Sequence, residues 1–418
     1  MIRYCLFFFL CWLPNSAILV DGQNVAATSS GVVIATNGGD NGLLVSMVTG
    51  DDRQQFEITN FGGGVSFFSS FDDVSIDPIN ENLVFALSTT AFTVCSFLLD
   101  GTTTDGSSAL ELLGCVGVFS VSPFCGVSAY GGTLMISGGT GGFTVYEYDQ
   151  QSGLIMDPPT LLNQQFPNII GHPDVLLINA NLAALSTDFD GGSSRFGTQM
   201  ASIDASRTSV AFDSDYRVEN TLGFELILQP SNFPLVNAIY RSSVANLLMY
   251  TANGPMQVQD LSSSEITVLV GAPDGFSAVT VAVNQAKQKL YFGGVLSSGG
   301  SLILAYDLSD DPFNPTLVET KQAAEQRITS IASGGDALAF MTTTNPGTIQ
   351  FWDTLPDAPV PEDETSANGS DVSPTPDDST LNETPAGVGD EESGGSSSLL
   401  QVGSLFSGTV LLAITMVY

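Results

Sequence analysis

The stretch Ile303-Leu304-Ala305-Tyr306-Asp307 decides the fold: a short apolar strand stops on an aspartate, and a turn follows. The same phrase returns seven times, at intervals of 46 to 56 residues. Its final aspartates are Asp51, Asp100, Asp149, Asp204, Asp260, Asp307 and Asp353. A period of this length is typical of the blades of a propeller rather than of a helical or leucine-rich repeat.

The sixth repeat shows how one phrase becomes one blade. Residues 276–284 and 290–296 form two strands, residues 301–308 carry the aspartate, and residues 316–320 close the unit. The connections are rich in Gly, Pro, Asn and Asp, as turns require. Because such a sheet cannot bury both faces alone, neighbouring sheets must stack around a ring. The sequence therefore predicts an all-β, seven-bladed β-propeller of four-stranded antiparallel blades over residues 23–355.

Two details of this ring are open to prediction. A carboxylate at a strand end can accept backbone N–H bonds from the following turn, so we expect the seven aspartates to be structural. The seventh repeat offers three strands and then runs into Pro356. We expect residues 24–28 to supply its missing outer strand from the opposite terminus.

Two repeats carry a family resemblance. Trp352-Asp353 looks like the Trp-Asp ending of a WD40 blade. Residues 306–318 are similar to the Asp-x-Ser-Asp-Pro-x-x-Pro phrase of LVIVD-type propeller repeats, with one extra residue before the first proline. WD40 blades usually add a Gly-His pair, whereas this chain has a single histidine, His172. The resemblance therefore implies propeller architecture and brings no active site with it.

Composition restricts the function classes. The formal charge is −34, from 44 acidic and 10 basic residues, and such a surface repels nucleic acids. Triads that need histidine would all depend on His172, which we place in a turn between repeats. The chain has no Cys-x-x-Cys pair for zinc. An enzyme is therefore not the leading prediction.

Calcium is the one cofactor that the sequence suggests. Asp188 and Asp190 precede Gly191-Gly192 and space two carboxylates as a Ca²⁺ loop does, but they do not complete a known loop. The alternative is a solvated acidic loop. These two aspartates are our candidate metal ligands.

The fourth repeat is the irregular one, because residues 217–234 exceed what a compact blade needs. Insertions in propellers map to loops on one face, and loops carry function more often than the scaffold does. We therefore name Tyr216, Arg217 and Phe224 as a candidate binding loop.

Both ends of the chain indicate export. Residues 1–22 have the layout of a secretory signal peptide cut before Gln23, with Ala17 as the alternative. Residues 356–392 form an acidic Ser/Thr/Pro stalk with N-glycosylation sequons at Asn368 and Asn382.

The last segment predicts membrane attachment. Residues 393–418 combine small residues, a spacer and an apolar tail, the layout of a GPI signal with Ser393 or Gly394 as the attachment residue. The alternative is a membrane span over residues 399–418 in a single-pass type I protein. No Lys or Arg follows that stretch in this sequence, which favours the lipid anchor.

Three cysteines remain after signal removal, which implies one disulfide and one free thiol. Cys115 and Cys125 close the shortest loop and are the preferred pair. Cys95 with Cys115 is the rival, although Cys95 reads as a small buried hydrophobe within a strand.

Together these features predict a monomeric, GPI-anchored glycoprotein at the cell surface that binds an extracellular protein or glycan. The alternative function is a propeller hydrolase, lactonase-like or glycan-acting, that uses acidic residues and Ca²⁺. Inward-facing carboxylates that converge at one end of the ring would distinguish the hydrolase.

Overall fold

The computed structural model describes the propeller region of the chain in segments. They are residues 24–37, 42–49, 52–59, 70–100, 109–118, 126–137, 142–162, 171–188, 196–213, 235–242, 247–253, 256–263, 265–323, 327–343 and 347–358. The chain divides into two units, residues 1–360 and 361–418, and every described residue lies in the first.

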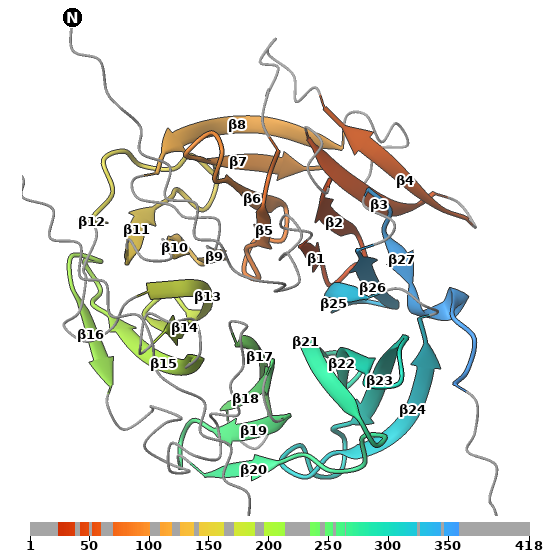
Figure 1. Ribbon diagram of the computed structural model, residues 1–418. Helices are drawn as coiled ribbons and strands as arrows, with labels where there is room; N and C mark the ends of the chain where they lie inside the picture. The colour runs from red at the N-terminus through yellow and green to blue at the C-terminus, as the bar shows by residue number, and fades with distance from the viewer. Residues whose placement is uncertain are drawn as a thin grey trace, which may run out of the picture. The chain divides into compact units, whose positions relative to one another are not determined.

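Seven antiparallel sheets follow one another along the described residues, and each is one blade (Figure 1). Blades 1 and 2 contain β1 (Val25–Ala27), β2 (Val33–Thr36), β3 (Leu43–Thr49), β4 (Asp52–Ile58), β5 (Asp73–Ile76), β6 (Leu83–Ser88), β7 (Thr93–Leu99) and β8 (Leu110–Gly117). Blades 3 and 4 contain β9 (Val127–Tyr130), β10 (Thr133–Ser137), β11 (Phe143–Glu147), β12 (Leu161–Leu162), β13 (Gly171–Asn179), β14 (Leu182–Asp188), β15 (Phe196–Ile203) and β16 (Val210–Asp213).

The remaining three blades continue the order. Blades 5 and 6 contain β17 (Val236–Arg241), β18 (Leu247–Ala252), β19 (Gln257–Asp260), β20 (Ile266–Val268), β21 (Phe276–Asn284), β22 (Lys289–Leu296), β23 (Ser301–Asp307) and β24 (Thr316–Gln322). Blade 7 contains β25 (Ile328–Gly334), β26 (Ala337–Thr342) and β27 (Gln350–Phe351), which the short 3₁₀ turn η3 (Trp352–Thr354) follows.

The blades close into a ring through their first strands. The first strand of each blade contacts the first strand of the next, and β25 of blade 7 contacts β1 of blade 1. The predicted all-β, seven-bladed propeller is therefore confirmed. The predicted four strands are present in six blades, while the described residues of blade 7 provide three.

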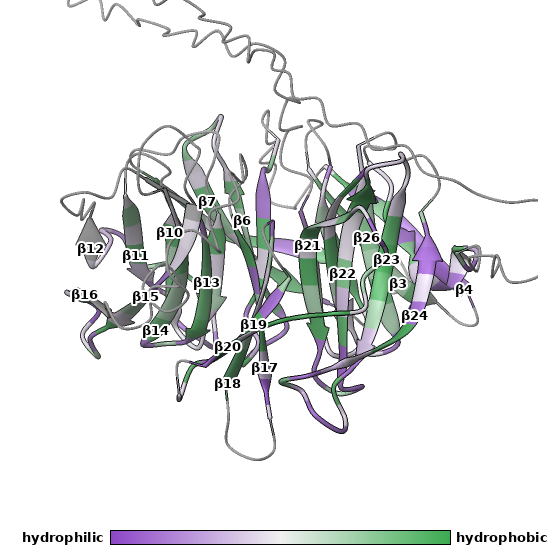
Figure 2. Ribbon diagram, turned by 60° about the horizontal axis from the view of Figure 1, so that its bottom comes forward, coloured by the Kyte–Doolittle hydropathy of each residue, from purple (hydrophilic) through white to green (hydrophobic). Residues whose placement is uncertain are grey.

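The apolar core lies between the blades. Among the described residues it splits into seven clusters, and each cluster joins residues of two neighbouring blades. In Figure 2, β21 and β22 are largely hydrophobic, whereas the outer strand β4 is hydrophilic. Each blade is thus stable only because its neighbours cover its faces, as expected for stacked repeats.

The expected mode of ring closure is wrong. β1 pairs with β2 as the innermost strand of blade 1 and does not join blade 7 as an outer strand. On the inside of the ring, the backbone N–H of Val25 donates to Ser330 Oγ of β25. β1 therefore completes blade 1 from the inside and does not complete blade 7 from the outside.

On the outside of the ring, Gln55 of β4 joins blade 1 to blade 7. Its Nε2 donates to the carbonyl of Gly347, and its Oε1 accepts the N–H of Ile349, both at 2.9 Å. The side-chain amide of Gln55 thus offers one N–H and one carbonyl oxygen, as the backbone of a neighbouring strand would. Arg53, also on β4, stacks its guanidinium 4.5 Å from the ring centre of Phe351.

The preferred disulfide is also wrong. The structure joins Cys95 to Cys115 and not Cys115 to Cys125. Cys95 and Cys115 lie directly opposite each other in the β7–β8 register, with Cα atoms 4.1 Å apart. Loop length favoured the other pair, but strand register decides which sulfurs can meet.

The chain leaves the ring along blade 6. Although composition places Pro356 in the stalk, residues 356–358 pair with the free edge of β24. The N–H of Gln322 donates to the Pro356 carbonyl, and the N–H of Ala358 donates to the Thr320 carbonyl, each at 3.1 Å. The folded part of the chain therefore extends at least to Ala358.

Candidate functional site

Four residues from consecutive blades meet where the inner strands begin, and we call them the inner rim: Asn24, Asp73, Gly126 and Asp174. All four rim residues precede a valine, as in Asn24-Val25, Asp73-Val74, Gly126-Val127 and Asp174-Val175. Asp73 Oδ1 and Asp174 Oδ1 each accept the N–H of the valine that follows, at 2.8 and 2.7 Å. This local bond fixes each carboxylate at the same level of the ring.

Gly126 creates the space in which the two carboxylates approach. A Cβ atom on Gly126 would collide with Asp174 Oδ1 and would lie 3.3 Å from Asp73 Oδ2. Asp73 is 8% exposed, and Asp174 is half-buried. The inner rim therefore brings two acidic groups of blades 2 and 4 together across blade 3.

Burial controls the ionisation of this pair. It raises the pKa of Asp73 to about 8, and the nearby charge of Asp174 adds to the effect. Burial likewise raises the pKa of Asp174 to about 7. Hydrogen bonds from the backbone N–H groups of Val127 and Val74 act in the opposite direction on Asp73 but do not outweigh burial.

Side chains of β5 and of Asp77, which follows it, fasten blade 2 to blade 3. Asp73 Oδ2, Ser75 Oγ and Asp77 Oδ1 accept the N–H groups of Val127, Ala129 and Gly131, at 2.6, 3.1 and 3.0 Å. The hydroxyl of Tyr148 donates to Asp77 Oδ2 at 2.7 Å. These bonds hold the inner rim on a rigid support.

A second set of polar residues was missed by the sequence reasoning. Buried hydroxyl residues lie at or within two residues of the ends of the second strands: Thr36, Ser88, Ser137, Ser186, Thr251 and Thr342. Ser137 Oγ accepts the N–H of Gly126 at 2.6 Å, and Thr36 Oγ1 accepts the N–H of Asn24 at 3.0 Å. A Ser or Thr that recurs at this place in six repeats is a signal that the sequence contained.

The recurring aspartates lie at the other end of the blades, at the close of the third strands. Asp149, Asp204, Asp260 and Asp307 each accept an N–H from the turn that follows. The hydroxyl of Ser206 holds the pKa of Asp204 down at about 2, and Lys289 lowers that of Asp307. Asp353 lies in η3, and Asp100 follows β7.

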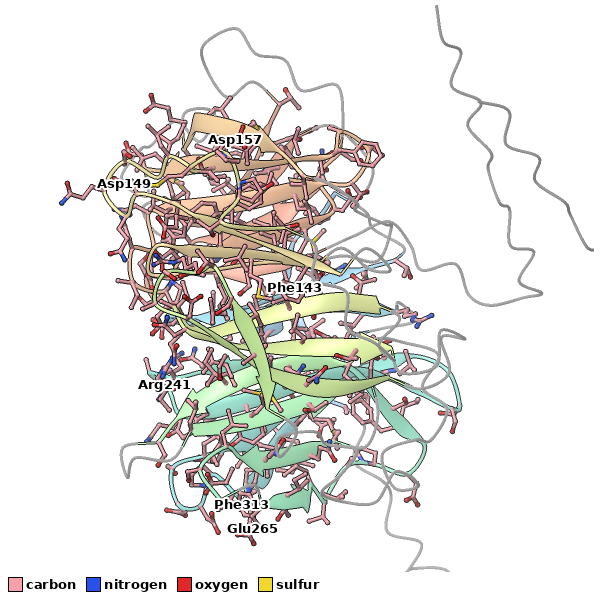
Figure 3. The ribbon with its side chains drawn as sticks, turned by 90° about the vertical axis from the view of Figure 1, so that its left-hand side faces the viewer. Phe143, Asp149, Asp157, Arg241, Glu265 and Phe313 are labelled. Atoms are coloured by element: carbon pink, nitrogen blue, oxygen red, sulfur yellow. A yellow bond between two sulfur atoms is a disulfide. The ribbon has the colours of Figure 1, made fainter. Side chains whose placement is uncertain are left out.

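Arginines bridge blades at this end as well. Arg207 forms an ion pair with Glu147 at 2.8 Å and joins blade 4 to blade 3. Arg241 of blade 5 donates to the carbonyl of Ile178 and lies over the ring of Tyr130. Figure 3 shows Asp149 and Arg241 on the same side of the molecule. This end of the ring therefore has a structural role.

Several predicted site residues lie outside the described part of the chain. They are Asp51, Cys125, Asp190, Tyr216, Arg217, Phe224, Asn368, Asn382, Ser393 and Gly394. Asp188 ends β14, and only its backbone is described. His172, expected in a turn, lies in β13 beside a break in the β13–β14 register between Gly171 and Asp174.

The described residues contain neither a metal-binding cluster nor a membrane-spanning helix. They contain no group of three or more His, Cys, Asp or Glu side chains arranged to hold a metal ion. Within the same segments, no helix is both long and apolar enough to cross a bilayer.

Comparisons with known proteins identify the fold. No protein-family model and no curated protein matches the chain. The solved WD40 repeats of RRP9 match with a TM-score of 0.51 at 9% identity, over 79% of this chain and 90% of that chain.

Two further solved structures are similar. A structure of the mitotic checkpoint complex matches with a TM-score of 0.51 at 11% identity, over 80% of this chain and 90% of that chain. The WD40 propeller domain of Doa1 gives 0.49 at 11% identity, over 80% and 94%. At such low identities the likeness shows the propeller fold alone.

Proposed function

We propose that this protein is a binding module, displayed at the cell surface on a glycosylated stalk and a C-terminal GPI anchor, that recognises an extracellular protein. The observation that carries the binding role is the fold, a seven-bladed propeller with WD40 structural neighbours. One of these neighbours belongs to a multiprotein complex, which supports a protein over a glycan as the partner.

The Cys95–Cys115 disulfide supports the extracellular part of the proposal. Disulfides persist in secreted and cell-surface proteins and are rare in the reducing cytosol. The signal peptide and the C-terminal signal predicted from the sequence agree with this compartment.

The anchor is tested on intact cells that express the full chain. Phosphatidylinositol-specific phospholipase C should release the protein into the medium, and the Ser393→Leu, Gly394→Leu double variant should stay cell-associated or fail to reach the surface. If the lipase leaves surface wild type in place while it releases a known GPI-anchored protein, the anchor is wrong and a membrane span replaces it.

The binding face is tested on the connection between β16 and β17. Replacement of Tyr216, Arg217 and Phe224 by alanine should reduce binding of the purified protein to cells about tenfold or more, without changing its melting temperature. Phe92→Ala, at a 54% exposed position in a turn of blade 2, is the control. Equal binding by all three proteins would remove this loop from the proposal.

A further inference from the structure

The inner rim holds two carboxylates without a cationic partner among the described residues. Neither Asp73 nor Asp174 forms an ion pair with a described Lys or Arg. Like charges in a partly buried position destabilise each other unless one of them takes a proton. The two carboxylates of the inner rim should therefore bind a proton more readily than an exposed pair of aspartates would.

Position in the ring makes this pair mechanically relevant. Asp73 belongs to blade 2 and accepts the Val127 N–H of blade 3, while Asp174 belongs to blade 4 and packs against Gly126 of blade 3. Repulsion between the two carboxylates would therefore act on three consecutive blades. Protonation of either group would remove this repulsion.

Few other ionisable groups of the described residues lie around the pair. On the blade 2 side, Asp72 turns its carboxylate to the N–H and hydroxyl of Thr89 at 2.6 and 2.7 Å. Asn24 of blade 1 is polar but uncharged, and its Nδ2 donates to the Asp72 carbonyl at 3.2 Å. Blade 3 contributes backbone groups and the hydroxyl of Ser137. On blade 4, His172 precedes Asp174 by two residues.

We propose that Asp73 and Asp174 are protonated under mildly acidic conditions, which lets blades 2, 3 and 4 pack closely at the inner rim, and that ionisation of both groups loosens the inner rim. Gly126 is part of the device, because any side chain there would separate the carboxylates. The proposal concerns conformational stability and does not depend on the proposed binding function.

The direction of the pH dependence follows from the pKa values. Both folded-state pKa values, about 8 for Asp73 and about 7 for Asp174, lie above the ordinary aspartate value of about 4 in the unfolded chain. The folded state therefore binds more protons between these limits, and its stability falls as pH rises. The contribution is complete below about pH 4 and is lost by about pH 8.

The test compares melting temperatures of the full chain between about pH 5 and pH 9. Wild type should melt several degrees lower at the alkaline end. The Asp73→Asn, Asp174→Asn double variant should lose most of this decrease, because an amide imitates the neutral acid without titrating. Asp274→Asn, at an exposed aspartate of blade 6, is the matched control and should follow wild type.

Two further measurements keep the test decisive. The His172→Gln variant should retain the wild-type pH dependence of the melting temperature. If this variant loses the pH dependence, the effect belongs to the histidine and not to the two aspartates. If the double variant fails to fold, the ¹³Cγ NMR signal of Asp73 is titrated in wild type and in Asp174→Asn. A midpoint near neutral pH that moves lower in the variant supports the pair, whereas titration of Asp73 below about pH 5 overturns it.

Discussion

Two neighbouring interfaces of the ring are built differently. Between blades 5 and 6, the rings of Tyr250, Phe292 and Tyr306 are fully buried, and Phe292 meets Tyr306 edge to face with centroids 6.0 Å apart. Between blades 4 and 5, the buried cluster is smaller and relies on Met200 and Met249. Aromatic pairs have defined geometry, whereas methionine adapts to irregular gaps.

The two interfaces also differ in their buried polar residues. Val258 of β19 joins the cluster between blades 5 and 6, so strand alternation directs Gln257 and Gln259 toward blade 4. Within the described chain, neither amide atom of Gln259 has a hydrogen-bond partner, although the residue is only 2% exposed. An unpaired buried amide costs free energy. The interface between blades 4 and 5 should therefore be less stable than the interface between blades 5 and 6.

The largest expected effect is at the aromatic interface. Phe292→Ala removes a ring that is completely buried, and the free energy of unfolding should fall by about 3–5 kcal/mol. Chemical denaturation followed by tryptophan fluorescence measures it. Val270→Ala, at a 79% exposed position of the same region, should change it by less than about 0.5 kcal/mol. Similar losses in both variants would mean that this interface is no stronger than the surface.

An intermediate effect of opposite sign is expected at the polar interface. Gln259→Met keeps the length of the side chain and removes the unpaired amide, so unfolding should cost about 1–3 kcal/mol more. The control is Gln350→Met, because Gln350 Nε2 donates to Thr342 Oγ1 at 3.1 Å and its loss should not stabilise the protein. A drop in melting temperature for Gln259→Met would show that its amide is paired in solution.

The smallest effect is expected where blade 7 meets blade 1. Gln55→Ala removes two hydrogen bonds to residues 347 and 349 and should cost about 1–2 kcal/mol. Gln54→Ala changes the neighbouring exposed residue, whose side chain points to the other face of β4, and should be close to neutral. Hydrogen exchange of the Ile349 amide gives a local readout. Unchanged protection there would contradict the bridging role.

The repeat could be read from the sequence because every blade ends its third strand in the same way. The aspartates of that phrase placed the blades in the correct order, and the turns after Asp149 and Asp307 have the predicted bonds. This repeated pattern of strand, aspartate and turn depends on residues close together in the sequence, so the sequence alone predicts it.

Contacts that depend on strand register or on ring closure could not be read in this way. Cys95 meets Cys115 because of the β7–β8 register, which turn spacing does not specify. Asp73 and Asp174 are separated by an entire blade in the sequence and meet only because Gly126 lies between them. The Gln55 side chain joins the first blade to the last, so no local sequence pattern predicts this contact.

The short pairing of residues 356–358 with β24 determines how the ring would respond to force. A pull on the chain beyond Ala358 would first load the hydrogen bond from its N–H to the Thr320 carbonyl, and the bond between Gln322 and Pro356 would follow. Under a pull directed away from blade 6, these bonds would be loaded in turn and would break one after another rather than together. Tension would therefore peel the exit segment from blade 6 before it reached Trp352, whose ring packs against Lys321 and Tyr291 and is the first firm mechanical stop.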